Sequence, residues 1–233
     1  HYLPRLQWTG RENELCITWM NRLQNLLRLI LIDTRTDKHR LLLEEKNNYY
    51  IELSDHLTFS KDGKYFYWSS EKDGTNQLYR YSIDGRLVNQ ITTGDHELTE
   101  FYGLNDDQTI AFYQRAEDRG RERKIYRIGV DGKGNQCITE AAGVHLAKMS
   151  KGGYYFVLSS STVDRPPVHS IVDQNGQLVR VIEDNAALKD RVAQYIYSPA
   201  QLGTIINRNG DQLNSLMIKP QNFDSAKKYP VLM

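Results

Sequence analysis

The chain has 233 residues, and its 30 Lys and Arg against 29 Asp and Glu leave a formal net charge of +1. This balance argues against broad electrostatic binding to nucleic acid or to an anionic membrane. No apolar run approaches the roughly 18 residues of a membrane-spanning helix, so we expect none. The two cysteines, Cys16 and Cys137, lie among strand-like residues outside any redox or metal motif, and we expect inert packing thiols without a disulfide.

A short β pattern repeats along the chain. A hydrophobic residue followed by a polar turn and then an apolar strand recurs every 45 residues, at Phe59, Leu104 and Met149. The hairpin dipeptides recur at spacings of 47 and 44 residues, at Asp84-Gly85, Asp131-Gly132 and Asn175-Gly176. Because this period is close to that of four-stranded propeller blades, the sequence predicts an all-β fold of about four antiparallel blades.

The first two copies cover about residues 5–45 and 56–94. In the first, we expect middle strands at Glu14–Met20 and 25–33. In the second, a short strand ends at Phe59 and three more follow, at Tyr65–Ser70, 77–83 and 87–92. Tyrosines alternate along these strands, and we expect their rings to pack between blades with the hydroxyls at the rim.

The third and fourth copies cover about residues 97–139 and 145–182. The third is interrupted at 117–123 by a charged stretch, interpreted as a solvated hairpin tip, with a partner-binding loop as the alternative. In the fourth, we expect middle strands at 154–160 and 168–173, separated by a rigid loop that contains Pro166-Pro167.

Residues 184–233 do not follow the blade spacing, so we separate them from a propeller unit of residues 1–183. Asp184 or Asn185 can cap a short helix at 186–193. The turn Asn209-Gly210 predicts a hairpin that joins strands at 204–208 and Gln212–Ile218. The apolar run 229–233 predicts the start of another strand.

Motifs for catalysis and metal binding are missing from the sequence. It contains neither the GxSxG nucleophile elbow nor HExxH, and the glycines near Asp131 lack the dinucleotide-binding pattern. The six histidines are scattered and no two carboxylates form an evident acid–base pair. We therefore predict no catalytic residue, no metal site and no cofactor.

Several segments, in order along the chain, resemble the propeller of dipeptidyl peptidase IV-like proteins in the prolyl oligopeptidase family, with the bacterial branch closest. The similarity is sharpest at Met217-Ile218-Lys219-Pro220. The other segments are residues 1–4, 19–25, 57–63, 68–74, 99–103, 181–185, 222–224 and 227–232.

The resemblance implies the second half of an eight-bladed ring, followed at 184–233 by the first part of a truncated α/β-hydrolase domain. It implies a longer protein that removes X-Pro or X-Ala dipeptides from peptide N-termini with a Ser-Asp-His triad. That protein would bind peptide substrates, form a homodimer, and act in the periplasm or outside the cell, with membrane association open. The triad and the amine-binding glutamates of the family fall outside residues 1–233, so we expect this chain to have no activity alone.

Where mammalian members place a substrate-side Arg, this chain has Ile51-Glu52-Leu53-Ser54. Glu52 is the candidate substrate-binding residue if it faces the cavity, although we favour a position on the rim. The alternative function is a non-enzymatic propeller that scaffolds protein or glycan partners, since a fold alone does not fix a function. A partial ring leaves blade faces uncovered, so we expect self-association or compact closure.

Overall fold

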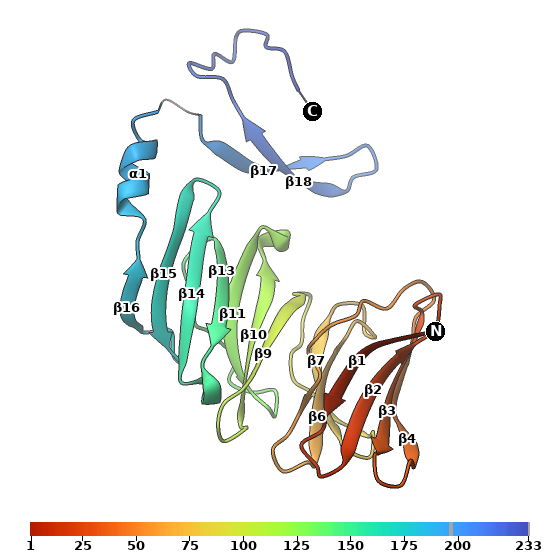
Figure 1. Cartoon of the computed structure of the whole chain (residues 1–233). Coiled ribbons are helices and arrows are strands. Elements are labelled where there is room, and N and C mark those ends of the chain that lie inside the picture. Colours follow the sequence, from red (N-terminus) through yellow and green to blue (C-terminus); the bar gives the residue numbers. More distant parts are fainter. Residues whose placement is uncertain (196–197, 233) are drawn as a thin grey trace.

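The structure, a computed structural model, describes residues 1–195 and 198–232. It consists mainly of antiparallel sheets that stand side by side (Figure 1). Blade 1 contains β1 (Tyr2–Trp8), β2 (Glu14–Met20), β3 (Leu26–Asp33) and β4 (His39–Lys46). Blade 2 contains β5 (Thr58–Phe59), β6 (Tyr65–Ser70), β7 (Gln77–Ser82) and β8 (Leu87–Gln90). Both sheets pair their strands in sequence order, which confirms the predicted four-stranded units.

Blades 3 and 4 follow the same plan and are joined at one point. Blade 3 contains β9 (Leu98–Leu104), β10 (Ile110–Glu117), β11 (Glu122–Gly129) and β12 (Gln136–Cys137). Blade 4 contains β13 (Val144–Met149), β14 (Tyr155–Thr162), β15 (Arg165–Asp173) and β16 (Leu178–Glu183). Because β12 is so short, the start of β11 has no β12 partner on the edge away from β10, and Arg123 there pairs in parallel with Val144. The sequence did not predict this link. Two short 3₁₀ turns, η1 (Asp118–Gly120) and η2 (Lys151–Gly153), lie within blades 3 and 4.

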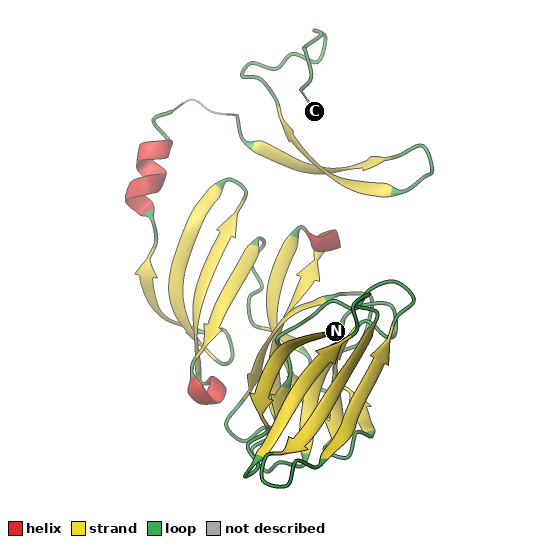
Figure 2. Ribbon diagram, turned by 45° about the vertical axis from the view of Figure 1, so that its right-hand side comes forward, coloured by secondary structure: helices red, strands yellow, loops and turns green. Residues whose placement is uncertain are grey.

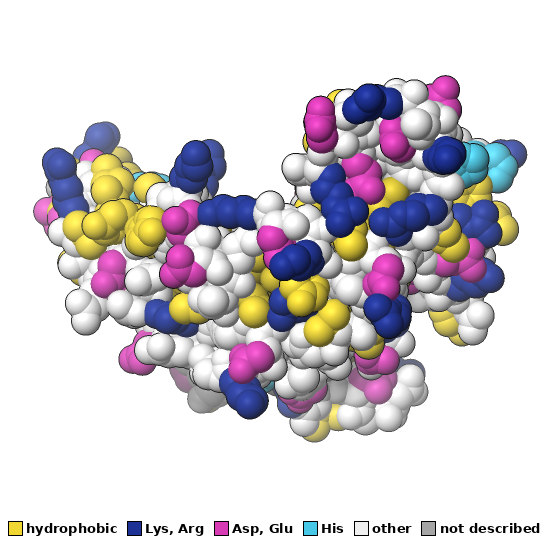
Figure 3. Space-filling model, turned by 90° about the horizontal axis from the view of Figure 1, so that it is seen from below, with side chains coloured by type: hydrophobic (Ala, Val, Ile, Leu, Met, Phe, Trp, Pro, Cys, Tyr) yellow, Lys and Arg dark blue, Asp and Glu magenta, His cyan; other side chains and the backbone are white. Residues whose placement is uncertain are grey.

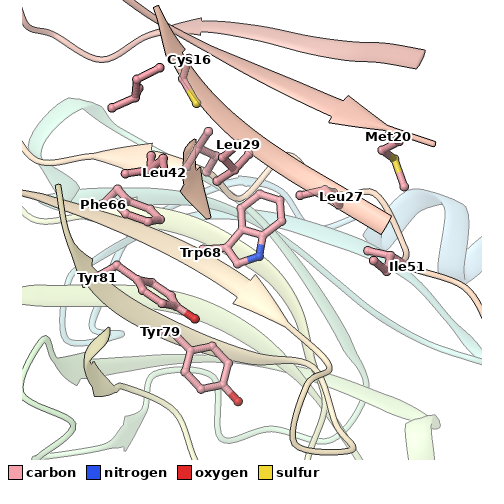
Figure 4. Packing of buried hydrophobic residues seen from close by; sticks show 12 residues of the cluster. Cys16, Met20, Leu27, Leu29, Leu42, Ile51, Phe66, Trp68, Tyr79 and Tyr81 are labelled. Carbon is pink, nitrogen blue, oxygen red and sulfur yellow. The ribbon is translucent and has the colours of Figure 1, made fainter. Parts of the chain in front are cut away.

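Three hydrophobic clusters fill the spaces between consecutive blades. Along β6, Phe66 and Trp68 face blade 1, whereas Tyr67 between them packs toward blade 3. Figure 4 shows Phe66 and Trp68 against the leucines of blade 1. The middle strands of blades 2 and 3 are therefore buried on both faces, and the predicted packing of tyrosines between blades is confirmed by Tyr67, Tyr79 and Tyr81.

The cysteines are free thiols, as expected. Cys16 is 1% exposed within the cluster between blades 1 and 2, and burial raises the pKa of its thiol to about 12. Cys137 is half-buried beside the cluster between blades 2 and 3. Since the reactive form of a cysteine is the thiolate, burial makes Cys16 unreactive.

The loop predicted around Pro166-Pro167 is shorter than expected. Both prolines lie in β15, and the hairpin with β14 closes at the pair Thr162 and Arg165. The pairing register shifts between Ser160 and Thr162, opposite the prolines. A proline has no N–H to donate, so it is tolerated in a strand at such an irregularity.

A helix and a hairpin follow blade 4. Asn185 occupies the N-cap position of helix α1 (Ala186–Val192), but its side chain donates to the Pro167 carbonyl oxygen. The Ala186 N–H is accepted by Asp184 instead. The hairpin pairs β17 (Ala200–Ile206) with β18 (Gln212–Ile218), and Figure 2 shows it beyond one end of the blades. Its first strand begins four residues before the predicted one.

The strand predicted at 229–233 is wrong for the residues described. Residues 229–232 form no strand, and Met233 lies outside the described residues. The ring of Tyr229 instead stacks on Phe223 at 5.2 Å between centroids. A strand needs a hydrogen-bonded neighbour, and no described strand lies beside this run.

Candidate functional site

A cleft of about 410 Å³ opens where the segment between β4 and β5 passes the ends of blade 2 and blade 3. Six carboxylates line it: Glu45, Glu52, Asp55, Glu71, Glu97 and Glu100. No Lys or Arg lines the cleft within the part of the chain that the structure describes. The opposite end of the blades, seen from below in Figure 3, has Lys and Arg interspersed with Asp and Glu. The cleft therefore concentrates negative charge on an otherwise balanced chain.

The wall of the cleft is fixed by hydrogen bonds between blades 1 and 2. Glu45, near the end of β4, accepts the Trp68 indole N–H at 2.9 Å through Oε2. Its other oxygen accepts the hydroxyl of Ser70, at the end of β6. Trp68 is 2% exposed, so its N–H needs this acceptor. The carboxylate of Glu45 is consequently held by its neighbours rather than free to move.

The predicted residue Glu52 lies on the cleft wall and is exposed. It belongs to a segment without strand structure that is anchored at both ends, because Ile51 and Leu57 are buried in the cluster between blades 1 and 2. The N–H of Ile51 also donates to the Gln24 carbonyl oxygen at 2.8 Å. Since Ile51 points into the cluster, its neighbour Glu52 is directed outward. Its role in binding stays a prediction.

A buried histidine connects the floor of the cleft to its acidic side. The Nδ1 atom of His56 lies 2.8 Å from the Ser69 hydroxyl, which is also 3.1 Å from the hydroxyl of Ser54. The Nε2 atom of His56 lies 3.6 Å from Glu100 Oε1. Burial lowers the pKa of His56 and, with help from the charge of Asp55, raises the pKa of Glu100.

This arrangement suits binding better than catalysis. The Ser69 hydroxyl is bonded by both His56 and Ser54, and Ser69 is only 5% exposed, so a substrate does not reach it. The exposed carboxylates can instead accept hydrogen bonds from cationic groups or from peptide N–H donors. Among residues 1–195 and 198–232, no group of His, Cys, Asp and Glu side chains could hold a metal ion.

The sequence pointed to Glu52 but not to its neighbours. His56 counted there as one of six scattered histidines, and Glu45 only as the last residue of the first copy. Local sequence carries no signal for the pairs His56–Ser69 and Glu45–Trp68, because each forms only when blades and linker pack together. The strands β2 and β6, by contrast, have the expected bounds.

Antiparallel four-stranded sheets packed face to face, with a cleft at their ends, define this chain as part of a β-propeller. A family model described as "Dipeptidyl peptidase IV (DPP IV) N-terminal region" matches residues 1–167, more than half of the chain. The chain belongs to this family, which confirms the resemblance noted in the sequence.

Relatives and a solved structure agree with this assignment. Dipeptidyl peptidase 4 of Felis catus is 27% identical over 100% of this chain and 32% of its own length; that of Sus scrofa is 26% identical with the same coverage. The crystal structure of Porphyromonas gingivalis dipeptidyl peptidase 4 matches with a TM-score of 0.93 and 30% identity, covering 98% of this chain and 33% of that chain. The chain thus spans about a third of the length of these relatives. No helix among the described residues is long and apolar enough to cross a membrane.

Proposed function

We propose that this chain supplies propeller blades to a serine exopeptidase that removes X-Pro or X-Ala dipeptides from peptide N-termini. In this role the blades position the peptide and limit access to the reactive site, while the chain itself performs no hydrolysis. The family assignment and the names of the relatives support a peptidase. The observation that carries the positioning role is the acidic cleft with Glu52 on its wall.

The chemistry of the cleft favours peptides that carry positive charge. Asp55 pairs with Arg5, which does not itself line the cleft, and no Lys or Arg in the described part of the chain lines the cleft beside the other carboxylates. A cationic side chain or peptide terminus that entered would gain charge-assisted hydrogen bonds, which are about twice as strong as neutral ones. Glu52, exposed and beside the anchored Ile51, is the residue we assign to contact the peptide.

Calorimetric titration with short X-Pro peptides tests this role. We expect a lysine-containing peptide to bind more tightly than one with glutamate in its place. Glu52→Gln should weaken binding of the lysine peptide by up to about fivefold, the range for one exposed ion pair. Glu12→Gln, a change at an exposed residue of the β1–β2 turn, is the matched control and should leave binding unchanged.

Equal binding of both peptides, unaffected by Glu52→Gln, would contradict the positioning role and favour a scaffold for other partners. The absence of hydrolysis is tested separately with a Gly-Pro chromogenic amide. We expect no turnover by this chain. Hydrolysis at enzyme-like rates would contradict the proposal that the chain itself is not catalytic.

A further inference from the structure

Two buried histidines of this chain make the same contact with a nearby serine. The Nδ1 atom of His56 lies 2.8 Å from the Ser69 hydroxyl, and the Nδ1 atom of His145 lies 2.8 Å from the Ser160 hydroxyl. His56 is 7% exposed and His145 is 3% exposed. The two imidazoles differ in what their second ring nitrogen, Nε2, faces.

In blade 4, the ring of His145 has a partner at both nitrogens. Its Nε2 atom lies 2.9 Å from the Ala141 carbonyl oxygen. Because a carbonyl oxygen only accepts hydrogen bonds, Nε2 carries the hydrogen of the neutral ring, and Nδ1 accepts the Ser160 hydroxyl. Neither of these partners titrates, and His145 does not line the cleft.

Just before blade 2, the ring of His56 faces the cleft instead. Its Nε2 atom lies 3.6 Å from Oε1 of Glu100 in β9, slightly beyond hydrogen-bonding distance. Both residues line the cleft. The Glu100 side chain is 51% exposed, so its carboxylate has room to approach the buried ring. A proton added to this pair therefore has a hydrogen bond to gain.

The groups around His56 make its surroundings acidic. In the described part of the chain, the ionisable groups that face it are Asp55, the preceding residue, and Glu100. Strand β6 contributes the hydroxyl of Ser69, which stays neutral. Arg5 of β1 pairs with Asp55 and offsets part of its charge. Glu100 is left as the carboxylate that can pair with the imidazole.

Burial moves the pKa values of His56 and Glu100 toward each other. It lowers the pKa of His56, against the charge of Asp55, and it raises the pKa of Glu100, with help from the same charge. Interacting groups that titrate over the same pH range behave as a pair. Uptake of one proton changes the charge of this pair from a single negative charge to zero.

The serines at the floor of the cleft accommodate this proton. Whether the proton lies on His56 or on Glu100, a hydrogen bond joins Nε2 to Oε1, and Nδ1 carries a hydrogen. Ser69 then accepts from Nδ1, and its own hydroxyl can donate to Ser54, 3.1 Å away. The hydrogen bonds of the floor are thus complete in both protonation states.

We propose that His56 and Glu100 form a shared proton site that controls the charge of the cleft. At neutral pH, the pair carries one negative charge and contributes to the binding of cationic groups. When the pair takes up a proton, this charge is lost and the carboxyl group of Glu100 turns from the cleft toward the ring. The effect on peptides rests on the proposed function, whereas the shared proton does not.

NMR titration of the full chain tests the shared proton, with the ring carbons of His56 and the carboxyl carbon of Glu100 as probes. Glu100→Gln removes the charge but keeps the shape of the side chain, and should lower the His56 titration midpoint by at least about 0.5 pH units. Glu97→Gln is the matched control, since it removes another exposed carboxylate of the cleft. In this control the His56 midpoint should stay within about 0.2 pH units of wild type, and His145 should be unchanged in both variants.

A His56 midpoint that moves no further in Glu100→Gln than in Glu97→Gln would overturn the shared proton site. His56→Gln gives the reciprocal measurement if Glu100→Gln perturbs the fold. It should raise the Glu100 midpoint, because the carboxylate loses its cationic partner. An unchanged Glu100 midpoint in His56→Gln would equally contradict the shared site.

Calorimetric titration with the lysine-containing X-Pro peptide at about pH 7 and about pH 5 tests the consequence for the cleft. Wild-type affinity should fall by up to about fivefold at the lower pH, the range for one exposed ion pair. Glu100→Gln should already bind weakly at the higher pH and change less. Equal wild-type affinity at both pH values would contradict control of the cleft by this pair. If the peptide binds at neither pH while Glu100→Gln still lowers the His56 midpoint, the proposed function is wrong and the shared proton site stands.

Discussion

The indole Nε1 of Trp68 donates a 2.9 Å hydrogen bond to Glu45 Oε2, joining blade 2 to blade 1 at the wall of the cleft. The bond combines two functions of the same side chain. The ring of Trp68 fills the cluster between the blades, while its N–H holds a carboxylate that lines the cleft. Stability and the shape of the cleft are therefore coupled at this position.

Substitution of Trp68 separates these contributions. Trp68→Phe keeps most of the apolar ring but loses the donor, and should lower the free energy of unfolding by about 1–2 kcal/mol. Trp68→Ala also leaves a cavity, and should cost about 3–5 kcal/mol. Urea denaturation measures both changes. Trp8→Phe, at a residue that is 62% exposed, should stay within about 0.5 kcal/mol of wild type. Equal effects of Trp68→Phe and Trp8→Phe would show that the indole bond contributes nothing.

Gly85 should tolerate no side chain. It has φ +89°, and a Cβ built there would lie 2.3 Å from the Leu42 carbonyl oxygen of blade 1. Gly85→Ala should therefore destabilise the chain by more than about 2 kcal/mol, combining backbone strain with a clash between blades. Gly74→Ala is the matched control, because Gly74 has φ +104° but nothing within 4 Å of its Cβ position. It should cost only the strain, about 1–2 kcal/mol. Thermal unfolding of both variants checks the difference, and identical losses would exclude the clash.

Stability should decrease in mild acid through His56. Burial lowers its folded-state pKa below the ordinary 6.5, so the unfolded state binds more protons. The free energy of unfolding should then fall as the pH drops below about 6.5. Burial also lowers the pKa of His145, which adds to the same trend. The raised pKa of Glu100 has the opposite effect on the free energy of unfolding. The stability that Glu100 provides is present at low pH and is lost as the pH rises through the folded-state pKa of this carboxyl.

Urea titrations between about pH 7 and about pH 5 measure this dependence. His56→Gln should make the free energy of unfolding depend less on pH. His39→Gln, at an exposed residue of blade 1, should leave this dependence unchanged. If the pH dependence of the free energy of unfolding is unchanged in His56→Gln, then the His56 imidazole gains its proton without destabilising the folded chain. Because Glu100 and Asp55 face His56, Glu100→Gln provides a further check and should steepen the decline.

The outer face of blade 4 should cause self-association. Tyr155, Val157 and Val179 are 51%, 46% and 57% exposed and line an apolar groove of about 440 Å³. Exposed apolar patches favour association, so light scattering should show a mass that rises with concentration. Val157→Lys should reduce it, whereas Val163→Lys, at an exposed turn residue, should not. A wild-type chain that scatters as a monomer at every concentration would contradict this prediction.

Local sequence patterns were enough to predict most of the strands and their turns. β2 (Glu14–Met20) and β6 (Tyr65–Ser70) have the predicted bounds, because alternating side chains and turn-forming glycines act on a few neighbouring residues. The repeat spacing also gave the four blades, and the order of short family motifs gave the assignment that the relatives confirm. These features are encoded locally or by recurrence, so they can be read without coordinates.

Contacts between side chains of different blades, in contrast, follow from how the sheets pack together. His56 reaches Ser69 because the segment after β4 folds across blade 2, and Asn214 reaches Arg119 because the hairpin turns back over blade 3. The strand expected at 229–233 has no pairing partner among the described strands, and Pro166-Pro167 extends β15 because an irregular pair accommodates missing N–H donors. Such contacts depend on how separate sheets stack, and side chains far apart in sequence leave no local pattern that records it.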